Sequence, residues 1–369
     1  MGKNPYSDLP KSAFWKTGVA QENPYAIEGI YKKKFNIPVN TKIATAGSCF
    51  SQHITRHLKK NGYNILDVEP PPAELPGNLH QNYGFSMYSA RYGNIYTVRQ
   101  LLQLSQEAAG EWTPQDYIWE KDGKYFDALR PAVEPEGLDS REEVQRQRQL
   151  HVSRVKELFK NLDLFIFTLG LTEMWVHKES GTVYPTAPGT LVGNFDASLY
   201  EFKNAQLGEI VKDFNDFQTV VKKIRGDKSF KCILTVSPVP LTATASGKHV
   251  LSATMYSKST LRSVAGQLST NQPHIDYFPS FEIVTNPRMH STAFADNLRS
   301  VRDETVETVM RHFFDQHLSF KDPYPLEDPL LDYSDVQCEE SLIELPLSQG
   351  NAPEKMPAIL VYGNSIPTK

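Results

Sequence analysis

Ser48 is the residue of this sequence best placed to act as a nucleophile. It follows the apolar segment 42–46 and Gly47, and a segment with helical spacing, about 50–60, comes directly after it. A serine at a strand-to-helix turn presents its hydroxyl above the sheet, where free helix N–H groups face a developing oxyanion. This position predicts ester hydrolysis or acyl transfer at Ser48, and the alternative role is that of a helix N-cap.

Cys49 is the rival nucleophile, one place further along. We expect its side chain to point into the core from the first helical turn. The other two cysteines, Cys232 and Cys338, are far away in the sequence, and no CxxC pair exists. This cysteine usage supports neither a zinc knuckle nor a disulfide framework, and it fits a reducing cytoplasm.

Short apolar runs alternate with amphipathic segments along most of the chain. The runs predict buried strands at 42–46, 63–68, 163–169 and 231–236, and one more within 275–285. The amphipathic segments predict helices at about 50–60, 97–106, 141–162, 202–223, 255–268 and 301–314. Strands that alternate with helices in this way predict an α/β fold with a central parallel sheet.

The predicted domain covers residues 41–320 of the 369-residue chain. Residues 1–40 are expected to be irregular. Residues 110–140 carry aromatic residues among prolines and charges and are interpreted as a surface insertion. Residues 321–369 are interpreted as an extended acidic and proline-rich tail.

The overall charge and hydropathy exclude several classes of partner. A net charge of −4 gives no electrostatic reason to expect nucleic acid or an anionic membrane. The first 21 residues are polar and are broken by Pro5 and Pro10, so they lack the apolar stretch of a signal peptide. No run of eighteen apolar residues is present, and we expect a cytoplasmic protein without a membrane span. The sequence does not indicate an oligomeric state.

Ligands of open parallel sheets bind outside the carboxyl ends of the strands. The candidate site residues therefore directly follow the predicted strands, at 47–48, 170–173, 237–239 and after Tyr277.

The string Ala46-Gly47-Ser48-Cys49-Phe50-Ser51 resembles the signature of the GSCFA family. Further strings resemble the same family in the same order, at 91–97, 168–175, 235–239, 256–259 and 277–282. The resemblance runs from about residue 40 to 315. GSCFA proteins are similar to the SGNH/GDSL hydrolases, a superfamily of esterases, lipases and carbohydrate acyl esterases or acyltransferases. The resemblance therefore implies a flavodoxin-like three-layer sandwich.

The resemblance also implies roles for individual residues. Ser48 matches the SGNH nucleophile, and Gly47 stands where many relatives carry aspartate. The oxyanion donors would be the Ser48 N–H, the Gly93 N–H and the Asn94 side chain. Thr172 stands where the Gly-x-Asn block of the superfamily has its asparagine. It departs from that pattern but is assigned, after Gly93 and Asn94, as the third oxyanion residue.

The general base is the least defined part of the predicted site. SGNH enzymes usually place Asp-x-x-His before the last helix, but residues 296–301 contain no histidine. His249 is the preferred base, because its small polar loop leaves the carboxyl end of a buried strand. His290 is the alternative and lies closer in topology to the usual place, and His80 is a weaker third candidate.

A catalytic histidine needs an orienting acid. Glu282 is the first candidate, because a carboxylate in its apolar surroundings needs a partner, and a salt bridge to a basic neighbour is its other possible role. Asp296 is the second candidate and could equally cap the final helix.

Other residues are expected to contact substrate. Tyr92, Ser237 and Glu173 are assigned to substrate binding, although Glu173 could instead hydrogen-bond a neighbouring loop. Lys258 and Arg262 are four apart and share a helical face. A solvated face is favoured for this pair over binding of an anionic group.

These observations predict a serine esterase or O-acyltransferase that acts on a small-molecule or carbohydrate acyl ester without a metal or organic cofactor. Aromatic residues of 83–96, with Trp112 and Trp119, are interpreted as a carbohydrate-stacking rim. The alternative is a catalytically degenerate module that binds a polysaccharide or a protein.

Overall fold

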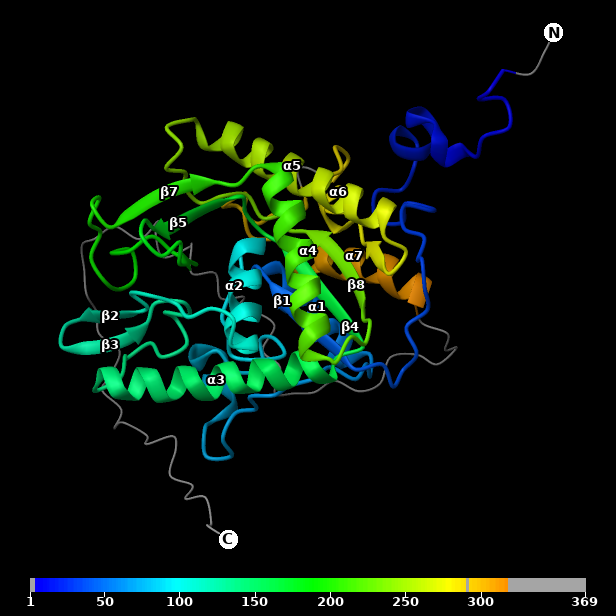
Figure 1. Ribbon diagram of the computed structural model, residues 1–369. Helices are drawn as coiled ribbons and strands as arrows, with labels where there is room; N and C mark the ends of the chain where they lie inside the picture. The colour runs from blue at the N-terminus through cyan, green and yellow to red at the C-terminus, as the bar shows by residue number, and fades with distance from the viewer. Residues whose placement is uncertain (1–3, 290–291, 318–369) are drawn as a thin grey trace.

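A parallel four-stranded sheet forms the centre of the computed structural model, which describes residues 4–289 and 292–317 (Figure 1). The strands are β1 (Ile43–Gly47), β4 (Leu164–Leu169), β8 (Lys231–Val236) and β9 (Ile275–Tyr277), in the order β1-β4-β8-β9. Four of the five predicted strands are therefore confirmed. The predicted tail 321–369 lies outside the described residues.

The fifth predicted strand, 63–68, is reduced to one bridge. Ile65 pairs in parallel with Ile43 of β1. With Ile65 at the outer position, the chain order across the sheet becomes 2-1-3-4-5, which is the flavodoxin-like order.

Successive residues of β4 face opposite layers of the molecule. Phe165 and Phe167 belong to the core cluster that contains α2 (Val98–Ala109), α3 (Arg141–Asn161), α4 (Leu207–Ile224) and α5 (Val250–Asn271). Leu164 and Ile166 belong to the cluster that contains α1 (Phe50–Lys60), α6 (Ser280–Val284) and α7 (Asp303–His317). Helices thus cover both faces of the sheet, and the predicted three-layer sandwich is confirmed.

A second, antiparallel sheet extends from the end of β4. Its strands are β6 (Val183–Tyr184), β5 (Glu173–His177) and β7 (Tyr200–Asn204), in that order. The predicted helix 202–223 is therefore wrong at its start, because Phe202 pairs with Trp175 of β5 and α4 begins only at Leu207.

The insertion 110–140 is a packed unit with its own hairpin, β2 (Ile118–Lys121) and β3 (Lys124–Asp127). Trp119 is 4% exposed and its ring centroid lies 4.7 Å from that of Tyr184. Tyr88 and Tyr92 are buried as well. The predicted stacking rim is wrong for these three side chains, because they are packed inside the protein.

Four short helical turns complete the described chain. They are Lys11–Ala13, Lys16–Ala20, Gly77–Leu79 and Gln81–Tyr83.

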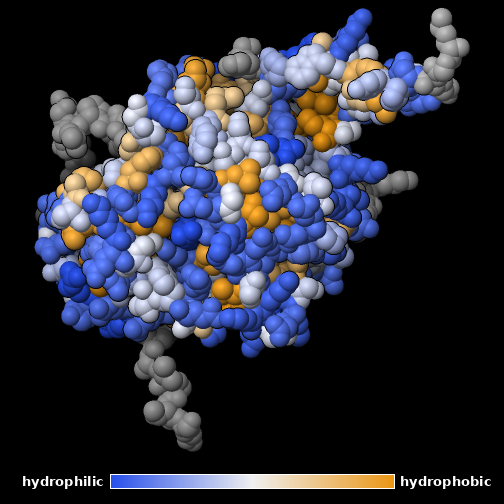
Figure 2. Space-filling view, turned by 45° about the horizontal axis from the view of Figure 1, so that its top comes forward, coloured by the Kyte–Doolittle hydropathy of each residue, from blue (hydrophilic) through white to orange (hydrophobic). Residues whose placement is uncertain are grey.

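The surface is mostly hydrophilic on the face shown in Figure 2, where hydrophobic residues form separate spots. Scattered spots of this kind are normal for protein surfaces. In residues 4–289 and 292–317, no helix is long and apolar enough to cross a membrane.

Candidate active site

The end of β1 is pressed against β4. Gly47 has φ +142°, and a Cβ at this position would lie 2.5 Å from the carbonyl oxygen of Thr168. Only glycine is compatible with this approach. The next residue, Ser48, donates its N–H to the same Thr168 oxygen over 3.3 Å and is 3% exposed.

The Ser48 hydroxyl is buried and has no hydrogen-bond partner among the described residues. It does not cap α1, because the N-cap is Cys49 and no side-chain cap bond is present. The Ser48 carbonyl accepts the Ser51 N–H instead. The helix-cap alternative is therefore wrong, and the hydroxyl belongs to the rare class of buried polar groups that need an explanation.

The loop that carries Gly93 and Asn94 lies beside Ser48. The Ile95 N–H donates to the Gly47 carbonyl over 2.9 Å, which ties the loop to the end of β1. Gly93 has φ +65°, a left-handed conformation that turns the loop at this point.

Tyr88 and Gln52 orient the Asn94 amide. The Tyr88 hydroxyl lies 2.5 Å from Asn94 Oδ1 and 3.1 Å from the Ser48 carbonyl oxygen. The Gln52 amide nitrogen lies 3.3 Å from the same Oδ1. These contacts hold the oxygen end of Asn94, so the Nδ2 donor faces the other way.

The turn after β4 contacts Ser48 directly. A Cβ added to Gly170 would lie 3.0 Å from Ser48 Cβ. The Gly170 and Leu171 N–H groups both donate to the carbonyl oxygen of Tyr96, over 3.2 and 2.9 Å. The turn therefore connects the nucleophile to the loop that carries Asn94.

Three buried hydroxyl groups at the ends of β1 and β4 lack partners within the described part of the chain. They are Ser48 Oγ, Thr168 Oγ1 and Thr172 Oγ1. Thr172, the predicted third oxyanion residue, is held by its own N–H, which donates to Ser257 Oγ over 3.1 Å.

The residues predicted to contact substrate have other partners. Glu173 accepts a 2.7 Å hydrogen bond from Thr244, so it adopts the loop-binding role, and burial raises the pKa of its carboxyl despite that bond. Ser237 Oγ accepts from the Val239 N–H. The Tyr92 hydroxyl donates to the Thr45 carbonyl, inside the protein.

The predicted base and acid are not paired with each other. His249 is the N-cap of α5, where its Nδ1 accepts the Leu251 N–H over 3.2 Å. Glu282 binds the Arg262 guanidinium and accepts a 2.7 Å hydrogen bond from Tyr277, which is the salt-bridge role. Burial, followed by the nearby Glu282 charge, raises the pKa of Tyr277.

Among the described residues, the remaining candidates give no histidine–carboxylate pair at Ser48 either. Asp296 is exposed and lies 3.3 Å from Arg302. His80 contacts the Leu75 carbonyl oxygen at 3.0 Å. His290 lies outside the described residues.

Lys258 and Arg262 do not share one environment. Arg262 is 40% exposed at its side chain, but Lys258 is 2% exposed. The predicted solvated face is therefore wrong for Lys258. Sequence reasoning also missed Gln52 and Tyr88, although Gln52 lies four residues after Ser48 and could have been found from helical spacing.

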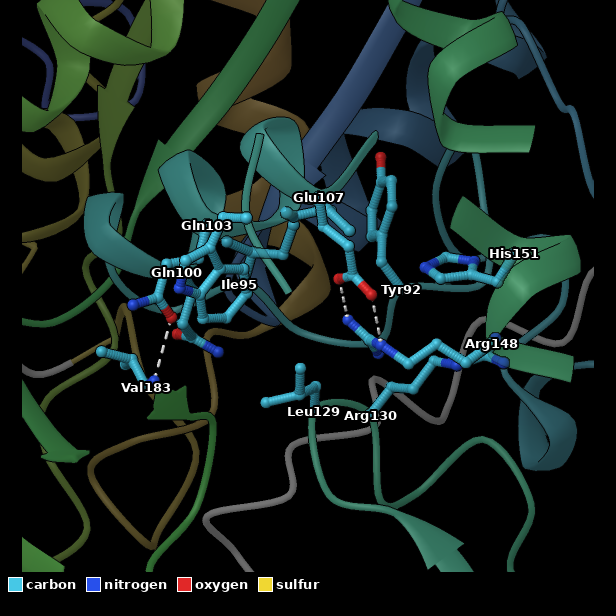
Figure 3. A pocket seen from close by; sticks show the side chains of 12 residues that line it. Tyr92, Ile95, Gln100, Gln103, Glu107, Leu129, Arg130, Arg148, His151 and Val183 are labelled. Carbon is cyan, nitrogen blue, oxygen red and sulfur yellow. Dashed lines mark hydrogen bonds and ion pairs between the residues drawn. The ribbon is translucent and has the colours of Figure 1, made fainter. Parts of the chain in front are cut away.

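A separate small cavity lies beyond Tyr92, and Ser48 is not among its lining residues (Figure 3). Arg148 lines this cavity and forms ion pairs with Glu107 and Asp127, the latter over 3.0 Å. Although burial opposes ionisation, Arg148 and then Arg130 hold the pKa of Asp127 below its usual value. These charged side chains are paired with one another. We therefore interpret them as a structural ion-pair network beside the cavity.

No group of three or more His, Cys, Asp or Glu side chains that could hold a metal ion lies within residues 4–289 and 292–317. The donor set at the strand ends consists of hydroxyls, amides and backbone groups instead. Hydrogen-bond donors of this kind can stabilise a developing oxyanion.

Comparison with known proteins gives one match. The family model described as the GSCFA family matches residues 42–313, from the start of β1 into α7. No curated protein and no solved structure matches the chain.

Proposed function

Because the chain belongs to the GSCFA family, we propose that it is a serine esterase or O-acyltransferase with Ser48 as the nucleophile. The observation that carries this proposal is the buried Ser48 hydroxyl, unpaired among the described residues and adjacent to Gly170 and the Asn94 loop. A buried hydroxyl without a partner costs folding free energy, and such costs are typical of functional sites.

The proposed reaction has two steps. Ser48 Oγ forms a bond to the acyl carbon, its proton passes to a base, and the carbonyl electron pair moves onto the oxygen. The tetrahedral intermediate then expels the alcohol, which takes up the proton. Water or a sugar hydroxyl attacks the resulting acyl-enzyme by the same sequence and releases Ser48.

Asn94 Nδ2, the Gly93 N–H and the Ser48 N–H are the proposed oxyanion donors. The Asn94 amide is already oriented by Tyr88 and Gln52. The Ser48 N–H has a long 3.3 Å bond to Thr168, so it must be shared with the oxyanion. Each such donor contributes about 10²–10³-fold to the rate in related chemistry.

A histidine, either His249 or His290, is the proposed base. His249 uses Nδ1 as an acceptor at the start of α5, so it must leave the Leu251 N–H to act with an orienting acid. Glu282, the proposed acid, must likewise exchange its contacts with Arg262 and Tyr277. Asp296, which is exposed, is the alternative acid.

The proposed substrate is a small-molecule or carbohydrate acyl ester. Thr172 and Ser237 follow strands β4 and β8 at the edge of the sheet where Ser48 follows β1. Hydroxyls at this edge suit the polar part of such an ester, and Glu173 is close in sequence to the same turn.

The test uses the full chain with p-nitrophenyl acetate and a fluorophosphonate probe. Ester hydrolysis and covalent labelling are expected for the native protein and for Cys49→Ala, and neither is expected for Ser48→Ala. Ser51→Ala is the matched control, because its hydroxyl is also buried but bonds the Ala46 carbonyl. Hydrolysis that survives in Ser48→Ala but is lost in Cys49→Ala would assign the nucleophile to the thiol.

The base is identified by comparing His249→Ala with His290→Ala. Loss of hydrolysis in only one variant identifies that histidine. Full activity in both variants, and in the double variant, would contradict a histidine base.

A degenerate binding module is the second candidate. Its support is that no histidine among the described residues contacts Ser48 Oγ, and that Glu282 and Asp296 are both paired with arginines. Absence of phosphonate labelling in the native protein, together with saturable polysaccharide or protein binding, would favour it.

A further inference from the structure

Lys258 is a buried cation at the carboxyl edge of the sheet. It lies on α5 and is 2% exposed. Its Nζ donates a 2.7 Å hydrogen bond to the carbonyl oxygen of Gly170. Burial of an ammonium group is costly, and lysines are almost never fully buried unless they are paired.

The peptide unit between Gly170 and Leu171 is bonded at both ends. Its carbonyl accepts from Lys258, and its N–H donates to the carbonyl oxygen of Tyr96 over 2.9 Å. Tyr96 follows Asn94 by two residues. A charged donor on one end of a peptide strengthens the hydrogen bond at its other end, so Lys258 acts on the Asn94 loop through this unit.

Ser257 adds a second contact from the same helix. Its Oγ accepts the Thr172 N–H over 3.1 Å. Helix α5 therefore holds the turn 170–172 at two successive residues, and Gly170 in that turn packs against Ser48 Cβ.

We propose that Lys258 is a positioning residue for acyl transfer: through the Gly170 carbonyl it holds the turn 170–172 against Ser48 and the Asn94 loop. The inference rests on the proposed function of Ser48 for its catalytic consequence. The effect of Lys258 on the turn 170–172 can be measured separately from catalysis. A positional error of about 1 Å at a reacting group costs about 100-fold in rate.

The test compares the full-length native protein with Lys258→Met by amide hydrogen exchange and by the rate of fluorophosphonate labelling. Methionine keeps the length and apolar part of the side chain but removes the donor. We expect exchange of the Gly170, Leu171 and Thr172 amides to become at least tenfold faster. Labelling of Ser48 should slow about 100-fold, with little change in unfolding midpoint.

Arg225→Met is the matched control. Arg225 is also a buried cation, and it also binds carbonyl oxygens, those of Phe159 and Lys160 at 3.0 and 3.1 Å. These residues precede β4, so Arg225 lies at the opposite edge of the sheet. Its replacement should lower stability without changing exchange in the turn or labelling of Ser48.

Lys258→Gln keeps a neutral donor and should recover part of the labelling rate, which also covers the case in which Lys258→Met does not fold. Unchanged exchange in the folded variants would overturn the inference, and so would faster exchange with an unchanged labelling rate. If the native protein is not labelled, the proposed function fails, and the exchange data still decide whether Lys258 holds the turn.

Discussion

Gly170 and Ser48 meet at the carboxyl edge of the sheet with no room for a side chain between them. A Cβ on Gly170 would lie 3.0 Å from Ser48 Cβ and 2.9 Å from the Tyr96 carbonyl oxygen. The surface that packs against the proposed nucleophile is therefore the backbone of Gly170. This backbone is fixed by hydrogen bonds and has no side-chain rotamers. Precise placement of this kind is what acyl transfer requires.

Gly170→Ala should disturb the packing of Gly170 against Ser48. The added methyl group must push against Ser48 or the Tyr96 carbonyl, and overpacking of this kind costs about 1–3 kcal/mol of unfolding free energy. Denaturant unfolding and phosphonate labelling should both show a loss. Gly208→Ala in α4 is the control, because a Cβ there has no atom within 4 Å. Equal stability of the Gly170 variant and the native protein would show that the contact can relax.

Ser48→Ala should raise the free energy of unfolding by about 1 kcal/mol, because it removes a buried hydroxyl that has no partner among the described residues. Ser51→Ala should lower the free energy by a similar amount, since the Ser51 hydroxyl donates to the Ala46 carbonyl over 3.1 Å. Urea unfolding of both variants measures the opposite signs. A loss of stability in Ser48→Ala would indicate that its hydroxyl is hydrogen-bonded in solution.

Tyr88→Phe should lower ester hydrolysis about tenfold, because Asn94 Oδ1 loses its 2.5 Å hydroxyl partner and keeps the longer 3.3 Å bond from Gln52, so the amide is oriented less firmly. Asn94→Ala should cost more, about 10²–10³-fold in kcat. The double variant should be no slower than Asn94→Ala alone, because both changes act through one amide. Additive losses would show that Tyr88 acts independently of Asn94.

His53 should make the protein sensitive to acid. Burial, and then the Arg56 charge, lowers its pKa from 6.5 to about 3. A lowered pKa in the folded state means that stability is complete above pH 6.5 and is lost as the pH falls towards 3. At pH 5 the loss is at most about 2 kcal/mol, and water at the partly exposed ring makes it smaller.

His53→Gln provides the measurement for this effect. The unfolding free energy of the native protein minus that of the variant should decrease from pH 7 to pH 5. The native protein loses stability as His53 becomes protonated, whereas glutamine does not titrate. Ionisable groups that do not interact with His53 contribute equally to both proteins and cancel. A constant difference over this range would contradict the lowered pKa.

The central sheet could be predicted because its strands carry a signal of their own. The run 164–169 is apolar at every position except Thr168, and all six residues are buried. The antiparallel sheet carried a weaker signal. Residues 200–204 mix aromatic and charged side chains, so their strand conformation depends on pairing with β5, which a single segment does not reveal.

The candidate site likewise contains one part that the sequence predicts and one part that it does not. The place of Ser48 at a strand-to-helix turn follows from local pattern, and the structure has this turn. The burial of Lys258 could not be predicted from its own helix, because the group that it binds is the Gly170 carbonyl, 88 residues earlier in the chain. A contact between a side chain and a distant backbone carbonyl leaves no pattern in the types of the neighbouring side chains.

Gly47 sets a limit on how this site can be altered. Its φ of +142° and the Thr168 carbonyl oxygen 2.5 Å from any added Cβ exclude every side chain there. The aspartate that many SGNH-like proteins place before their serine cannot be introduced by a single substitution. Conversion would require β1 and β4 to separate at this point.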